Sequence, residues 1–158
     1  MPDGCRSSGP DPRVPVAHET RTAIATPPQQ VWALLVDTKT WKSWWPAVRD
    51  ARAFDFKPLH DKSRFEVTLQ FKRLRATLVP RVVLAGEGKT LAWETRWAGV
   101  PLHQEWFLDP KPDGCRVTVR LRFDGPGATV LRWLRLDRGW DLMQHEQLRG
   151  LKRLAERL

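Results

Sequence analysis

In the second half of this chain the spacing of apolar residues changes near residues 125–127, and this change restricts the folds that the chain can adopt. Between residues 64 and 123, apolar and polar residues alternate, as in strands that bury one face of a sheet. From residue 127 onward, apolar residues return every three or four positions, as in a helix with one buried stripe. A one-sided sheet and a striped helix can bury their apolar faces against each other, so we predict an α+β fold.

The alternating part of the sequence predicts a continuous antiparallel sheet with one wet face. In residues 64–71, for example, Phe65, Val67 and Leu69 share one side of the strand. We expect strands at residues 16–25, 64–71, 74–85, 91–97, 102–108 and 115–123, with turns at 86–89 and 110–114. Arginines occupy outward positions of these strands, namely Arg64, Arg75, Arg81, Arg116, Arg120 and Arg122.

Two short helices are expected after the first strand, and one long helix at the C-terminal end. Thr26 stands before two prolines as a helix cap would, and Asp37 or Thr38 could cap a second short helix that ends at Pro46. The long helix is expected from about Gly127 to Glu156, with a possible bend at Gly139. The stripe that should face the sheet consists of Trp133, Leu136, Trp140, Met143, Gln147, Leu151, Leu154 and Leu158.

Residues 1–15 differ in composition from the rest of the chain, because Pro, Gly and Ser dominate and apolar periodicity is missing. We expect a disordered leader there, followed by a single domain over residues 16–158. The leader lacks the apolar segment of a secretory signal, and no apolar run is long enough to cross a bilayer, so we expect a cytoplasmic protein. Cys5 and Cys115 are too few and too different in setting to indicate a disulfide framework.

The net charge of +9 raises the question of an anionic partner. The outward arginines could contact phosphates, but no aromatic residues lie between them for base stacking. We therefore favour a solvated basic surface, and we predict no specific nucleic-acid partner.

The sequence carries no motif for a metal or a nucleotide. It has no HExxH or CxxC motif, and the glycines at 86–88 fit a hairpin turn better than a phosphate loop. We therefore expect no metal and no cofactor. The four histidines are scattered, and none forms a pair with a nucleophile: His18, His60, His103 and His145. His145 lies nearest the helix stripe and is a weak candidate for a catalytic residue; no other is assigned.

The chain has nine tryptophans and no tyrosine. On the faces assigned above, indoles from the strands and the helix enclose a shared interior. They could simply fill a core, or they could line a cavity in which a few polar side chains orient an apolar ligand. The candidate ligand-binding residues are Trp93, Thr95, Trp97, Gln104 and Trp106 from the strands, Trp133, Trp140, Met143 and Gln147 from the helix, and Trp41, Trp44 and Trp45 at the mouth.

Several local motifs are informative together: TPPQQVWALLVD at residues 26–37, WWPAV at 44–48, LAW at 91–93 and LDPKPDG at 108–114. They resemble the polyketide cyclase/dehydrase and lipid-transport group of the START-like (SRPBCC, Bet v 1-like) superfamily. The resemblance covers residues 16–158 and implies a helix-grip fold, in which a curved antiparallel sheet wraps around a long C-terminal helix. It implies no single reaction, because the superfamily includes both enzymes and carriers.

We expect the protein to bind or transport a small hydrophobic ligand, whether aromatic, polyketide-like, prenylated or lipid, in an internal cavity. One alternative is an enzyme of the polyketide cyclase/dehydratase type, with a side chain such as His145 moving protons. A further alternative is a basic adaptor that binds RNA, an acidic protein or an anionic membrane. We expect a monomer or a homodimer.

Overall fold

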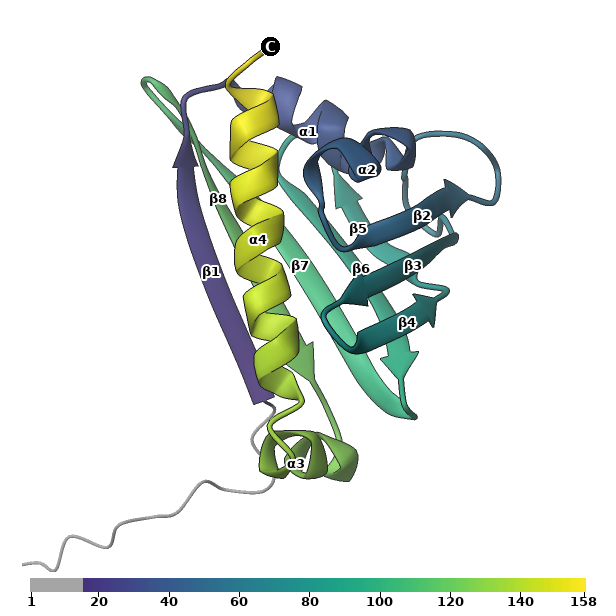
Figure 1. The fold of residues 1–158 in the computed structure, drawn as a ribbon. Helices are drawn as coiled ribbons and strands as arrows, with labels where there is room; N and C mark the ends of the chain where they lie inside the picture. Colours follow the sequence, from purple (N-terminus) through teal and green to yellow (C-terminus); the bar gives the residue numbers. More distant parts are fainter. Residues whose placement is uncertain (1–15) are drawn as a thin grey trace, which may run out of the picture.

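The computed structural model describes residues 16–158, and the leader expected at residues 1–15 lies outside this range. Two antiparallel sheets form the walls of the domain (Figure 1). The larger sheet, in the order β1-β8-β7-β6-β5, consists of β1 (Val16–Ile24), β8 (Gly114–Phe123), β7 (Val100–Lys111), β6 (Thr90–Trp97) and β5 (Arg81–Gly86). The smaller sheet, in the order β2-β3-β4, consists of β2 (Val48–Ala53), β3 (Phe65–Phe71) and β4 (Leu74–Leu78).

The alternation of the sequence is reproduced in the central strands of the larger sheet. Gln104 of β7 stands opposite Trp93 of β6 on one side and Leu121 of β8 on the other. All three side chains are buried, whereas Arg120, the neighbour of Leu121, is exposed. The register therefore brings an amide and an indole to the inner face together, as the alternating pattern predicted.

The predicted continuity of the sheet is wrong. The run at residues 74–85 divides at Pro80, and its two halves enter different sheets as β4 and β5. Proline has no N–H to donate, so it is unsuited to the interior of a paired strand. The seam between the sheets is held by a short set of backbone contacts: Phe65 donates to the Pro80 carbonyl (3.2 Å), and Val82 donates to the Ser63 carbonyl (2.8 Å).

A second departure follows along β5. The pairing of β5 with β6 shifts between Val82 and Leu84, which marks a bulge. A bulge inserts one extra residue and so reverses the side to which later side chains point. Simple alternation would put Leu84 on the same face as the buried Val82, but Leu84 is 49% exposed because of the bulge.

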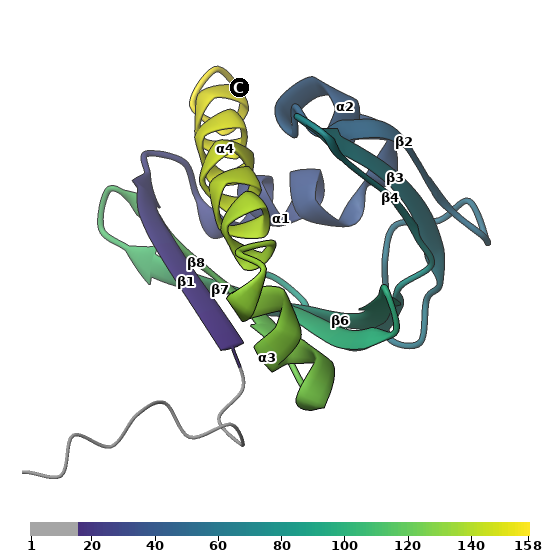
Figure 2. The same ribbon diagram turned by 60° about the horizontal axis from the view of Figure 1, so that its bottom comes forward.

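The long helix α4 lies on the concave side of the sheets (Figure 2), which matches the predicted helix-grip architecture. Figure 2 shows α4 between the larger sheet on one side and the smaller sheet on the other. The helical elements are α1 (Pro28–Val36), η1 (Thr38–Thr40), α2 (Trp41–Trp44), α3 (Pro126–Trp133) and α4 (Asp137–Ala155). Asp37 caps η1 by accepting from the Lys39 N–H at 3.1 Å, as expected.

The prediction of one continuous C-terminal helix is wrong, because the helix breaks between α3 and α4. Arg135 takes a left-handed conformation with φ 60°. Its N–H donates to Arg132 (3.1 Å), and the N–H of Leu136 donates to Leu131 (2.9 Å). This pair of bonds is the Schellman motif that commonly ends a helix. Gly139, where a bend was expected, lies inside α4.

The C-terminal half of α4 is docked tightly against the N-terminal segment. A Cβ added at Gly150 would overlap the Trp44 carbonyl oxygen, so only glycine permits this approach of α4 to α2. Thr26 does not cap α1, whose N-cap is Pro27, because its hydroxyl instead donates to the Ala155 carbonyl at 2.9 Å. These contacts fix the position of α4, which contributes part of the inner wall.

Candidate functional site

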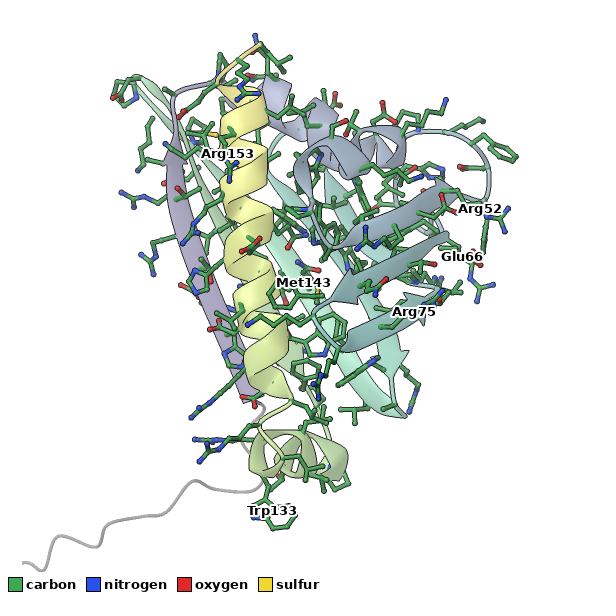
Figure 3. The ribbon with its side chains drawn as sticks, in the orientation of Figure 1. Arg52, Glu66, Arg75, Trp133, Met143 and Arg153 are labelled. Atoms are coloured by element: carbon green, nitrogen blue, oxygen red, sulfur yellow. The ribbon has the colours of Figure 1, made fainter. Side chains whose placement is uncertain are left out.

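A small cavity lies where the two sheets and α4 meet. The larger sheet contributes Trp93, Thr95, Leu102, Gln104 and Leu121; the smaller sheet and its link to β5 contribute Phe65, Val67, Leu69, Leu78 and Pro80; Trp45, Trp140, Met143, Gln144 and Gln147 complete the lining. Figure 3 shows Met143 on α4, beside the strands of the smaller sheet. The cavity is therefore where the sequence placed it, between sheet and helix.

The structure brings part of the predicted set together at this cavity. The predicted residues that line it are Trp45, Trp93, Thr95, Gln104, Trp140, Met143 and Gln147. Their role in binding a ligand stays a prediction. Eight lining residues were not on the candidate list, and four of them come from β3 and β4. The alternation of these strands marked one face as buried but gave no reason to separate a cavity wall from a core.

Three glutamines supply most of the polarity of the wall. Gln104 Nε2 donates to Gln147 Oε1 at 3.1 Å. Gln144 Nε2 donates to the Val119 carbonyl at 2.9 Å, which holds α4 to the larger sheet. All three side chains are buried. The amides therefore have fixed positions, because each is anchored to a different strand or to a neighbouring amide.

Several polar atoms on the lining residues have no hydrogen-bond partner among the described residues. They are Trp45 Nε1, Trp140 Nε1, Gln147 Nε2 and Gln144 Oε1. An unpaired buried donor or acceptor costs about 1 to 3 kcal/mol, so such groups are rare in folded proteins. The residues that line this one cavity therefore carry three donors and one acceptor without a partner among the described residues.

The side chains nearly fill the cavity. Its volume is about 20 Å³, which is room for about one water molecule. An aromatic ligand can enter only if side chains of the wall move. Met143 is suited to such movement, because its side chain is unbranched and flexible.

A cluster of indoles occupies the interior beside the cavity. Trp41 lies 5.7 Å from Trp93 between ring centroids, and Trp44 lies 6.2 Å from Trp106. Trp41 Nε1 donates to the Leu35 carbonyl at 3.1 Å, and Trp44 Nε1 donates to Thr40 Oγ1 at 3.2 Å. The expectation that Trp41 and Trp44 stand at a cavity mouth is wrong, because both are buried in this cluster. Trp106 is also buried in this cluster and does not line the cavity.

Two further candidates lie away from the lining. Trp133 is 81% exposed and points away from the domain, so its expected inward orientation is wrong (Figure 3). The break at Arg135 is the reason, because α3 does not continue the face of α4. Trp97 is half-buried and packs edge-to-face on Trp140 at 5.2 Å between centroids, so it supports the wall from behind.

None of the described residues that line the cavity carries a titratable side chain. His145, the weak catalytic candidate, lies on the exposed side of α4, 3.7 Å from Asp141. His18 contacts Asp137 at 3.2 Å at the start of α4, and it also lies outside the lining. Burial raises the pKa of the Cys115 thiol, which disfavours a reactive thiolate. The described lining therefore offers apolar contacts and hydrogen bonds, whereas acid–base chemistry would need a group from elsewhere.

The described part of the chain shows neither a metal centre nor a membrane span. Residues 16–158 contain no group of three or more Asp, Glu, His or Cys side chains that could hold a metal ion. Within the same range, no helix combines the length and apolar character needed to cross a bilayer.

Comparison with known proteins places this architecture in a family. A family model described as "Polyketide cyclase / dehydrase and lipid transport" matches residues 16–156. No curated protein matches the chain.

Solved structures with the same fold share little sequence with the chain. Protein MLL2253 from Mesorhizobium loti is similar with a TM-score of 0.71 and 19% identity, over 90% of this chain and 98% of that one. TTHA0849 from Thermus thermophilus is similar with a TM-score of 0.72 and 15% identity, over 87% of this chain and 95% of that one. The di-domain ARO/CYC StfQ from the steffimycin biosynthetic pathway is similar with a TM-score of 0.74 and 15% identity, over 92% of this chain and 52% of that one. At these identities the similarity shows the fold alone.

Proposed function

Because the chain belongs to the polyketide cyclase/dehydrase and lipid transport family, we propose that it binds a small apolar molecule bearing carbonyl groups in the cavity between α4 and the sheets. The observation that carries this proposal is the set of unpaired buried polar atoms on cavity-lining residues, three donors and one acceptor. Carbonyl oxygens accept hydrogen bonds from such donors, and the apolar remainder of the ligand would be buried against indole and aliphatic side chains. A cytoplasmic location stays a prediction.

Binding would require the cavity to widen, and the structure offers two means. Met143 is a flexible side chain in the wall, and a different rotamer would enlarge the space beside the smaller sheet. The seam between the sheets depends on few backbone contacts, including that of Phe65 with Pro80. We expect the smaller sheet to move outward along this seam when a ligand enters.

The enzymatic alternative, a polyketide cyclase or dehydratase, also draws on the family and on the fold shared with StfQ. The unpaired N–H groups could polarise a ligand carbonyl, as the cyclisation of a polyketide requires. Moving a proton needs a second group, and the described lining has no titratable side chain to supply it. Binding without catalysis is therefore the function that we propose.

The proposal can be tested by titration with two ligands that share a bicyclic carbon skeleton, only one of which bears carbonyl groups. 1,4-Naphthoquinone and naphthalene are suitable, with tryptophan fluorescence as the readout. The substitution Gln147→Met removes a buried amide donor from a lining residue. The matched control, His145→Met, introduces a methionine on the exposed side of the same helix. A lost hydrogen bond of about 0.5 to 1.5 kcal/mol predicts several-fold weaker binding of the quinone to Gln147→Met, with naphthalene unaffected. Equal affinities of both variants for the quinone would contradict the proposal.

A further inference from the structure

We propose that α3 and the turn after it form a docking surface for membranes that contain anionic phospholipids. This docking surface consists of Val130, Trp133, Leu134 and Leu136 with Arg132, Arg135 and Arg138. It lies outside the cavity, and the two kinds of binding can be measured separately.

The apolar part of the docking surface is unusually exposed. Trp133 is 81% exposed, Val130 53% and Leu134 52%, and Leu136 follows at 41%. Single exposed apolar residues are common on proteins, but a group of this size within one short segment marks an interaction site. Burying the group against a partner would therefore be favourable.

The position of α3 leaves these side chains accessible. α3 lies at one end of the domain, beyond the ends of β1 and α4 (Figure 1), and Trp133 extends away from the body (Figure 3). Only Ala128 and Leu131 of α3 are buried. The Schellman turn at Arg135 separates α3 from the buried stripe of α4, so the outward side of α3 has no neighbour in the described domain.

The charges beside the apolar group are positive. Arg132, Arg135 and Arg138 are exposed, and none of them forms an ion pair within the part of the chain that the structure describes. Two carboxylates lie nearby, but both face His18: Asp137 at 3.2 Å and Asp141 at 3.5 Å.

The three arginines also line an open groove that could receive phosphate groups. The groove has a volume of about 870 Å³, lies next to Trp133, and is lined by the two carboxylates as well. Indoles at the headgroup level, flanked by arginines, are the residue types by which proteins attach to anionic bilayers.

The shape and charge of the docking surface favour a bilayer over the other possible partners. A stable protein interface needs about 800 Å² on each side, which a small projecting tip cannot easily provide. A symmetric pair of chains joined at α3 would bring the arginines of one copy toward those of the other, and like charges placed together weaken association. A bilayer accepts the tip among its headgroups and supplies the opposite charge.

The test is sedimentation of the full chain with vesicles of phosphatidylcholine and phosphatidylserine in a two-to-one ratio, compared with phosphatidylcholine alone. We expect binding to the anionic vesicles only. Trp133→Ser should weaken it about tenfold by removing the inserted indole. Replacing Arg132, Arg135 and Arg138 together by glutamine should weaken it further, by about fivefold for each arginine.

Matched controls distinguish a docking surface from general attraction by a basic protein. Phe56→Ser removes an equally accessible aromatic residue at another place, since Phe56 is 75% exposed. Changing Arg64, Arg75 and Arg81 to glutamine removes the same charge from the sheets. Both controls should bind as the unchanged protein does. Equal loss in the controls, or no binding to anionic vesicles, would overturn the proposal. So would a dimer that Trp133→Ser dissociates, since α3 would then contact a second copy.

Discussion

The indole cluster and the cavity wall lie side by side in the same interior, but their indole N–H groups differ in whether they have a hydrogen-bond partner. In the cluster, the N–H groups of Trp41 and Trp44 donate to oxygens of the protein. In the wall, those of Trp45 and Trp140 have no partner among the described residues. All four side chains are buried to a similar extent. The division is not complete, because Nε1 of Trp106, which lies in the cluster, also has no partner among the described residues.

Burial alone therefore does not identify a binding residue. A tryptophan whose N–H is paired contributes to stability by packing and hydrogen bonding, and its loss should be felt mainly in folding. A tryptophan whose N–H is unpaired on a cavity wall contributes the same packing but keeps a donor available. Substitutions in the two regions should therefore separate stability from binding.

The largest effect should come from the helix that carries the cavity wall. Gly150→Ala would force a Cβ against the Trp44 carbonyl, so α4 and the indole cluster must separate, and we expect a loss of about 3 kcal/mol or more in the free energy of unfolding. Gly139→Ala is the matched control in the same helix, because a Cβ there meets nothing within 4 Å. It should increase stability by about 1 kcal/mol through helix propensity. Denaturant unfolding measures the stability of both variants. A mild effect of Gly150→Ala would mean that the close approach of Gly150 to the Trp44 carbonyl does not hold α4 against the indole cluster.

A second, smaller effect should separate an indole whose N–H is hydrogen-bonded in the cluster from one whose N–H has no partner in the wall. Trp41→Phe and Trp140→Phe remove similar volumes, but only the first leaves a buried carbonyl, that of Leu35, without its donor. We expect Trp41→Phe to be the more destabilising by about 1 to 2 kcal/mol in chemical denaturation. If Trp140→Phe destabilises equally, the N–H of Trp140 is already paired in the folded protein, and the contrast between cluster and wall is lost.

A smaller effect should show how firmly the smaller sheet is attached. In the loop between β2 and β3, the hydrogen bond that His60 Nε2 donates to the Asp55 carboxylate raises the pKa of His60, with help from the Asp61 carbonyl, and the same bond lowers the pKa of Asp55. Asp61 also accepts from the Ala85 N–H at 2.6 Å, which ties this loop to β5 across the seam.

These two pKa shifts define the pH range in which the pair stabilises the fold. The raised pKa of His60 gives stability that is fully present below its usual value of 6.5 and is lost as the pH rises through the folded value. The lowered pKa of Asp55 gives stability that is present above 3.8 and is lost as the pH falls. Asp55→Asn should therefore lower the melting temperature most near about pH 5 and least near about pH 8. A difference that does not change with pH would show that the pair does not secure the seam.

The periodicity of the sequence predicts those residues of the site that lie on regular strands and helices. Alternation along β6 and β7 identified Thr95 and Gln104, and helical spacing identified Met143. The error at Trp133 arose because Arg135 ends α3 in a conformation that glycine usually adopts, so no residue type marked the break.

Other features depend on distant contacts that periodicity cannot show. Pro80 is visible in the sequence, but the assignment of β4 and β5 to separate sheets depends on which strands lie beside them. Likewise, nothing local to Trp41 or Trp44 tells whether their indoles face a cavity or one another, because that follows from the packing of α2 against α4 and the larger sheet.

An NMR titration of the indole N–H groups tests most directly whether the cavity is the binding site, since each tryptophan gives its own signal. Adding 1,4-naphthoquinone should shift the Nε1–H signals of Trp45 and Trp140, two residues that line the cavity and whose N–H groups have no partner among the described residues. The signals of Trp41, which is hydrogen-bonded in the cluster, and of Trp133, which is exposed on α3, should change little. Shifts confined to Trp133, or none at Trp45 and Trp140 when the quinone binds, would contradict the claim that the cavity is the binding site.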